Sequence, residues 1–249
     1  ENYDVGIIHP LKNAYLDYVF GAGEGVRPLD EDFYKLLDFL RKNGIQYHFI
    51  DETLLAKYGK AEDETLVVGE CCYSTIILPK MVSLASTTER LLSAYKGKLW
   101  VEENPQFIDG KKRTVNLRSN ITQEEIIENA RIKFSCPDNR CLLTSRKGEI
   151  GEFIFIKNTY LEKDSVVQMQ GVAEHYQKLN LETLQTENIS NELFIKANDS
   201  VILFKNNFAN PCRVEESEEK ITSDFSLTGI SENAFVMDYA QYSKDGKTY

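Results

Sequence analysis

The adjacent thiols Cys71 and Cys72 are the first candidates for chemistry, because a cysteine thiolate is a strong nucleophile. A nucleophile on a tight strand-to-helix turn needs glycine two residues before it and two residues after it. Gly69 meets the first requirement for Cys71, but Tyr73 stands where the second glycine should be. No histidine is near in the sequence to act as the base. The two thiols are therefore predicted to lie at the edge of a strand, and a cysteine-dependent enzyme remains an alternative.

Two pairs of neighbouring carboxylates, Glu102–Glu103 and Asp51–Glu52, raise the question of acid–base chemistry. Hydrolysis of a glycosidic bond uses two carboxyl groups that face each other about 5–9 Å apart. Adjacent residues of a strand point to opposite faces of the sheet, and Glu102–Glu103 ends a strand-like segment. This pair is predicted to be solvated or to cap the next turn, whereas Asp51 and Glu52 are expected to cap and begin a helix.

The glycine-rich stretch 21–25 would bind phosphates only if its spacing matched a known loop. A dinucleotide-binding loop has a third glycine where this chain has Val26, and it lies directly between a strand and a helix. The Gly-Lys-Ser or Gly-Lys-Thr of a phosphate-binding loop is absent. No nucleotide or other cofactor is therefore expected.

The remaining cysteines and the histidines predict no metal site. The chain has five cysteines, an odd number that forbids complete internal pairing. Four residues separate Cys136 from Cys141, so a disulfide between them and a pair of free thiols are both open. Free thiols favour a reducing compartment such as the cytoplasm, with a secreted or periplasmic location as the alternative. None of the histidines, His9, His48 and His175, is spaced to form a metal site with another, and His9 is expected to be structural.

Aromatic side chains gather in one segment that is predicted to be a loop after the first strand: Tyr15, Tyr18 and Phe20. Such rings can stack on a sugar or dock against another domain, and core packing is the competing use. They are the candidate carbohydrate-binding residues. Tyr160 and Tyr176, in the later part of the chain, are a second candidate platform.

The composition is that of a folded acidic domain. The chain of 249 residues carries 29 basic and 39 acidic side chains, for a formal net charge of −10. An acidic surface disfavours nucleic acids and anionic membranes, because phosphates need cationic partners. No uncharged apolar run reaches the roughly 18 residues of a membrane span, and no signal peptide is visible. The length predicts one to two domains with a substantial core.

The first part of the chain alternates short apolar segments with amphipathic ones. Expected strands cover 4–8, 45–50, 65–69, 73–79 and 98–102, and expected helices cover 30–44, 52–58 and 86–95. Acidic residues begin the helix at 30–44, basic ones end it, and Gly44 marks its end. Such alternation is typical of a mostly parallel sheet covered on both faces. Residues 1–118 are predicted to form an α/β domain with a doubly wound, flavodoxin-like sheet.

After residue 131 the pattern changes to short alternating strands without long helices. Expected strands cover 141–145, 151–156, 165–169, 175–181, 192–195 and 200–204. A short connecting helix before them should begin at a capping box formed by Thr122 and Glu125. Residues 119–208 are predicted to form a small antiparallel β-sandwich domain. Residues 209–249 are expected to be a linker and the start of a further β domain, as in a piece of a larger protein.

Several segments, taken in order, resemble the region that follows the catalytic barrel in large glycoside hydrolases of the alpha-L-rhamnosidase type. They also resemble the similar domain of some beta-galactosidases. The segments are Asp4–Pro10, Asp51–Gly59, Leu66–Gly69, Ile76–Pro79, Leu179–Thr183, Asn198–Phe204 and Glu232–Tyr239. The chain departs from the family pattern at Asn180, where an acid is usual, and at Leu184, where a glycine is usual. The resemblance implies that the α/β domain is like a class I glutamine amidotransferase.

The resemblance also implies a function. The parent protein would hydrolyse glycosidic bonds, with alpha-L-rhamnosides as candidate substrates, and its catalytic carboxylates would lie in a barrel before Glu1. No residue here matches a catalytic position of the family, so this segment is expected to be a noncatalytic, accessory scaffold. Its expected partners are the barrel and the downstream β domains of the same chain. A carbohydrate-binding module is the first alternative, and a stand-alone cysteine-dependent amidotransferase-like enzyme is the second.

Overall fold

The computed structural model describes residues 4–206 except 18–26, 131, 137, 139, 150, 173, 182 and 184. The chain divides into two compact units, Glu1–Cys212 and Arg213–Tyr249, and every described residue belongs to the first unit. The linker and further β domain predicted for 209–249 therefore lie outside the described residues. No helix in the described part is long and apolar enough to cross a membrane.

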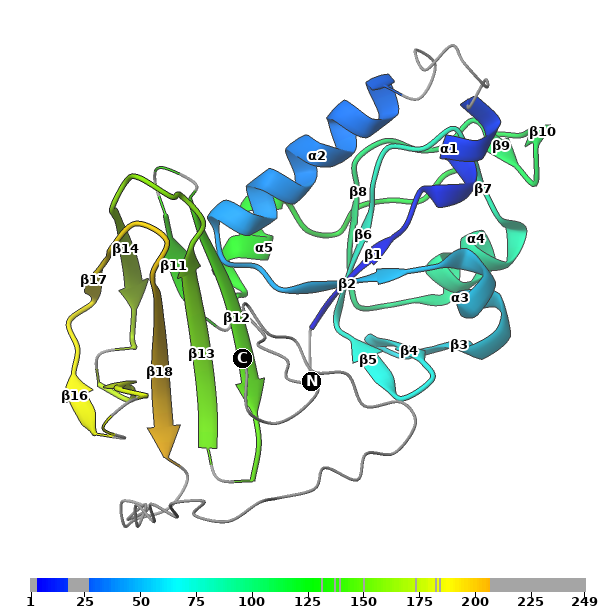
Figure 1. The fold of residues 1–249 in the computed structure, drawn as a ribbon. Coiled ribbons are helices and arrows are strands. Elements are labelled where there is room, and N and C mark those ends of the chain that lie inside the picture. Colours follow the sequence, from blue (N-terminus) through cyan, green and yellow to red (C-terminus); the bar gives the residue numbers. More distant parts are fainter. Residues whose placement is uncertain are drawn as a thin grey trace, which may run out of the picture. The chain divides into compact units, whose positions relative to one another are not determined.

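The first half of the described chain is built on a four-stranded parallel sheet (Figure 1). Its strand order is β2-β1-β6-β8, with β1 at Val5–Ile8, β2 at Tyr47–Ile50, β6 at Thr75–Leu78 and β8 at Lys98–Val101. The helices are α1 at Leu11–Asp17, α2 at Arg27–Lys42, α3 at Glu52–Tyr58, α4 at Ser86–Ala94 and α5 at Gln123–Glu128. All three strand pairings are parallel.

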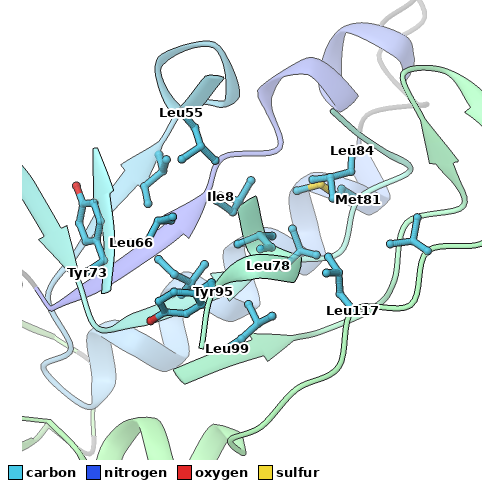
Figure 2. Close-up of a cluster of buried hydrophobic side chains, with 14 of the residues drawn as sticks. Ile8, Leu55, Leu66, Tyr73, Leu78, Met81, Leu84, Tyr95, Leu99 and Leu117 are labelled. Carbon is cyan, nitrogen blue, oxygen red and sulfur yellow. The ribbon is translucent and has the colours of Figure 1, made fainter. Parts of the chain in front are cut away.

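Both faces of this sheet are buried, because successive side chains of a strand point to opposite sides. On one face Ile7 and Ile77 pack with Leu36 and Leu40 of α2 and with Ile126 of α5. The other face carries a larger cluster that includes residues of α3 and α4 (Figure 2). Its labelled members are Ile8, Leu55, Leu66, Tyr73, Leu78, Met81, Leu84, Tyr95, Leu99 and Leu117.

Two small sheets flank the parallel one. The antiparallel sheet β3-β4-β5 has strands Gly59–Glu62, Thr65–Val68 and Cys71–Tyr73, and the sheet β10-β9-β7 has strands Lys111–Lys112, Phe107–Ile108 and Ser83–Leu84. The strand predicted at 73–79 is confirmed as β6 over Thr75–Leu78, but Tyr73 belongs to β5, so the predicted start is wrong. The chain leaves the hairpin at Ser74, because the amides of Ser74 and Thr75 both donate to the carbonyl of Asp4 and start the parallel strand β6 there.

The helix ends follow local signals. The helix predicted at 30–44 runs from Arg27 to Lys42. Its end has the hydrogen bonds of a Schellman motif. The amide of Gly44 donates to the carbonyl of Arg41, and the amide of Ile45 donates to the carbonyl of Leu40. Gly44 has a φ of 63°, which favours glycine. The predicted capping box of Thr122 and Glu125 is confirmed at the start of α5.

The second half of the described chain forms two antiparallel sheets. One is β11-β14-β17, with strands Lys133–Ser135, Ser165–Gln170 and Glu192–Ile195. The other is β12-β13-β18-β15-β16, with strands Cys141–Lys147, Gly151–Asn158, Ser200–Asn206, Gln177–Leu179 and Thr186–Asn188. Buried side chains of both sheets, among them Phe134, Val167, Ile154 and Leu203, form one hydrophobic cluster.

Short polar contacts join this part to the parallel sheet. Gln46 donates from Nε2 to Ser145 Oγ at 2.9 Å and accepts at Oε1 from the amide of Ser145 at 2.8 Å. The amide of Cys136 donates to the carbonyl of Lys42. These contacts place the start of β2 against the middle of β12, and we call them the joint.

Candidate functional site

The carboxyl edge of the parallel sheet is where an open α/β sheet usually binds ligands. Lys80, after β6, lies 3.1 Å from Asp32 Oδ2 and 3.7 Å from Glu103 Oε2. Its amide donates to Glu102 Oε2 at 3.0 Å, so Glu102 caps the chain after β6, 22 residues earlier, and the predicted cap of the turn after Glu103 stays a prediction. Hydrogen bonds from Lys35 and Lys80 lower the pKa of Asp32. The charged groups at this edge are thus bonded to one another.

A second set of polar groups at this edge is buried and holds the chain that leads into α4. Glu52 accepts at Oε1 from the amide of Ala85 at 2.7 Å, and Asn13 accepts at Oδ1 from the amides of Val82 and Ser83. Glu52 is a first-turn acid of α3, as predicted, but the sequence did not predict that its side chain is buried against the start of α4. Asp51 does cap α3, as predicted, through the amides of Thr53 and Leu54.

Aromatic rings cluster beside these polar groups. His9 stacks on Phe49 with ring centroids 4.9 Å apart, and Phe33 and Tyr47 lie within 6 Å of Phe49. This contact gives His9 the structural role that the sequence predicted. Phe49 stays half exposed because β2 is the edge strand of the sheet. The sequence did not predict this cluster, since its members come from α2, from β2 and from the residue after β1.

Of the three aromatic residues predicted to bind carbohydrate, the structure describes only Tyr15. Tyr15 is 69% exposed on α1, so the expectation that it lies in a loop is wrong. Tyr18 and Phe20 lie outside the described residues. Arg140 covers the ring of Tyr160 at 4.1 Å, and Tyr176 is buried in the antiparallel half, so these two do not form an exposed platform.

The thiols Cys71 and Cys72 lie on β5, at the edge of a three-stranded antiparallel sheet. They have no helix after them, unlike a nucleophile on a strand-to-helix turn. Tyr73 lies beside them, and its hydroxyl is 3.0 Å from His48 Nδ1. Burial and then the contact with Cys71 raise the pKa of the Tyr73 phenol. No histidine is near these thiols in the sequence, because His48 is 25 residues from Tyr73 along the chain.

The second cysteine pair is in the antiparallel half. Cys136 and Cys141 are free thiols and both are buried. Cys136 donates from Sγ to Asp138 Oδ1 at 3.0 Å, and Ser165 donates to the same carboxylate at 2.8 Å. The hydrogen bond with Cys141 lowers the pKa of Cys136, against the effects of burial and of the bond to Asp138. In the described part of the chain no group of three or more His, Cys, Asp or Glu residues could hold a metal ion.

Thiol labelling should follow this burial. On the folded chain, iodoacetamide should modify the exposed Cys72 at the rate of an ordinary exposed thiol. Cys136 and Cys141 should react about a hundredfold more slowly, because the antiparallel half must open first. Peptide mass spectrometry over a time course measures each site, and labelling in urea is the control. Modification of Cys71 or Cys72 much faster than of a free cysteine would instead support a catalytic thiol.

No family model matches the chain, and no curated protein does. Solved structures do match. A rhamnosidase from Novosphingobium sp. PP1Y aligns with a TM-score of 0.53 and 16% identity over 88% of this chain and 24% of that chain. A catalytic mutant of Gan42B, a GH42 beta-galactosidase from G. stearothermophilus, aligns with a TM-score of 0.51 and 10% identity over 83% of this chain and 41% of that chain.

These comparisons bear on the fold. The chain spans about a quarter of the length of the rhamnosidase and about two fifths of the beta-galactosidase. The predicted resemblance to proteins of the rhamnosidase and beta-galactosidase type is confirmed for the fold. The expectation that the α/β domain is like a class I glutamine amidotransferase stays a prediction. The chain therefore has a fold that also occurs as one part of these two glycoside hydrolases.

Proposed function

We propose that this chain is a noncatalytic accessory region of a glycoside hydrolase. In this proposal the first half is an amidotransferase-like, flavodoxin-like α/β domain, and the second half is a small β-sandwich. The parent protein hydrolyses glycosidic bonds, and alpha-L-rhamnosides are its candidate substrates. Its catalytic barrel and its downstream β domains are the partners of this region.

The observation that carries the proposal is the coverage of the structural match. Nearly the whole of this chain, 88%, aligns within only 24% of a chain described as a rhamnosidase. A region of that size is a part of such a protein, alongside others that remain unmatched. The strand order β2-β1-β6-β8 and the shared core of the two antiparallel sheets support the proposed fold types.

The bonding of the acidic side chains supports the noncatalytic role. A retaining or inverting glycosidase needs two carboxyl groups that face each other across the substrate. At the carboxyl edge of the parallel sheet, Glu102 and Glu52 accept from backbone amides, while Asp32 and Glu103 pair with Lys80. Each of these carboxylates already has a bonding partner within the chain. The joint, with its paired bonds between Gln46 and Ser145, is the kind of contact that a scaffold needs to hold two parts together.

A direct assay tests this role. The purified chain should release no product from aryl alpha-L-rhamnosides or aryl beta-galactosides above the level of a heat-denatured sample. The physical reason is that the carboxylates at the carboxyl edge of the parallel sheet, Glu52, Glu102, Glu103 and Asp32, are already bonded within the chain. Turnover that persists through purification and disappears with a Glu102→Gln or Glu103→Gln substitution would contradict the proposal.

A further inference from the structure

A groove of about 570 Å³ runs along the sheet β11-β14-β17, which Figure 1 shows as three neighbouring strands of the antiparallel half. Ile127 and Glu128, at the end of α5, line it together with residues of all three strands or their ends. Its volume lies within the usual range of small-molecule sites. Such sites are mostly apolar with a few polar groups that orient the ligand. This groove has the same character, since apolar surface exceeds polar surface in its lining, and amide and charged side chains stand along it. The lining therefore suits a ligand that has both apolar and polar surfaces.

The outer face of the sheet arranges these side chains in register. Gln168 of β14 pairs with Ser135 on one side and Glu192 on the other, and Gln170 pairs with Lys133. Directly opposite residues of neighbouring strands have Cβ atoms about 5 Å apart. The side chains thus form a continuous polar surface across three strands.

Three of these groups are available to a ligand. The side chains of Gln168, Gln170 and Glu192 make no hydrogen bond or ion pair with another residue of the described chain. Lys133 is different, since its Nζ donates to the carbonyl of Ile127 at 2.9 Å and to the next carbonyl of α5. Lys133 therefore fixes the wall of the groove, and the two amides offer both donors and acceptors to its occupant.

An apolar surface continues the polar one. Phe194 is 60% exposed and pairs directly with Val166, which is 40% exposed. Both point to the same face as Glu192 and Gln168, two residues further along their strands. From Val166 to Gln170 the face extends about 13 Å, which is longer than one pyranose ring. An exposed ring beside paired amides suits a molecule that has an apolar face and a hydroxylated edge.

We propose that this groove binds a neutral oligosaccharide. The carboxylates of Glu128 and Glu192 outnumber the one lysine, whose charge is already directed to carbonyl groups, so anionic ligands are disfavoured. Sugar hydroxyls both donate and accept, which matches the free amides, and the C–H face of a sugar ring can stack on Phe194. The choice of a carbohydrate over other hydroxylated molecules rests on the proposed function.

Isothermal titration of the full chain tests the groove. Neutral galactose and rhamnose oligosaccharides should bind with sub-millimolar affinity, and an oligogalacturonide of matched length should bind more weakly. Gln168→Ala and Phe194→Ala should each weaken binding by roughly fivefold to tenfold, because each removes one contact. Gln185→Ala, an exposed glutamine outside the groove, is the matched control and should leave the affinity unchanged.

Three results would overturn the proposal that the groove binds a neutral oligosaccharide. They are no binding of any neutral oligosaccharide at millimolar concentration, tighter binding of the oligogalacturonide than of the neutral oligosaccharides, or equal affinity in Gln168→Ala and Gln185→Ala. Failure here differs from failure of the accessory role. If the chain neither binds oligosaccharides nor turns over aryl glycosides, oligosaccharide binding by the groove is rejected and the accessory role is kept. If the chain turns over aryl glycosides, the accessory role is rejected, and the titration still decides whether the groove binds an oligosaccharide.

Discussion

Replacing Asn158 by alanine should lower the free energy of unfolding by about 3 kcal/mol. Asn158, at the end of β13, is fully buried, and its Nδ2 donates to the carbonyls of Lys163, Ile195 and Lys196. Its Oδ1 accepts from the amide of Tyr160. One side chain thus satisfies buried backbone groups from the connection before β14 and from the end of β17. Alanine removes all of these bonds, and although the carbonyl of Lys196 keeps the amide of Asp199, each buried group left unsatisfied costs about 1–3 kcal/mol.

Two further variants make this prediction specific. Asn158→Asp keeps the shape but directs a carboxylate at carbonyl oxygens, so at neutral pH it should cost at least as much as alanine. Asn188→Ala is the control, because Asn188 is exposed and its side chain accepts a hydrogen bond from the exposed Gln177, so its cost should stay below about 0.5 kcal/mol. Urea denaturation followed by circular dichroism gives the three values. A fully stable Asn158→Asp variant would contradict the role of Nδ2 as a donor.

The sequence predicts best what depends on neighbouring residues. The bounds of α3 agree with the prediction because Asp51 bonds to amides two and three residues away. The capping box of Thr122 and Glu125 is equally local. At the end of α2, the amide of Gly44 bonds to the residue three positions earlier, and the amide of Ile45 bonds to the residue five positions earlier. In each case the residues that decide the structure lie within one turn or so of one another, so their spacing alone carries the information.

What the sequence did not predict depends on distant partners. Glu52 looks like an ordinary helix acid until α4 brings Ala85 to it, 33 residues later. His48 meets Tyr73 only through the pairing of distant strands. The sequence around Asn158 does not indicate its role, because its side chain donates to the carbonyl of Lys196, 38 residues away. The side chains of the proposed groove come from three strands whose register is set by the buried core, not by local pattern.

Replacing Gly44 by alanine should destabilise the chain by about 3 kcal/mol, for two separable reasons. The φ of 63° costs a residue with a side chain about 1 kcal/mol or more. A Cβ atom at Gly44 would also come within 2.6 Å of the Cβ of Phe134, in the first strand of the antiparallel half. The Cβ of Phe134 is fixed to the backbone of β11, so it cannot turn away from the contact as the tip of a flexible side chain can.

A matched glycine separates the two reasons. Gly171, after β14, has a φ of 69°, and a Cβ there would meet nothing within 4 Å. Gly171→Ala should therefore show the backbone cost alone, about 1 kcal/mol, and the difference between the two variants measures the contact between Gly44 and Phe134. Adding Phe134→Ala cannot relieve the clash, since alanine retains Cβ, whereas Phe134→Gly should recover the contact part once its own cost is subtracted. Equal unfolding free energies for Gly44→Ala and Gly171→Ala would mean that the end of α2 and β11 do not meet as described.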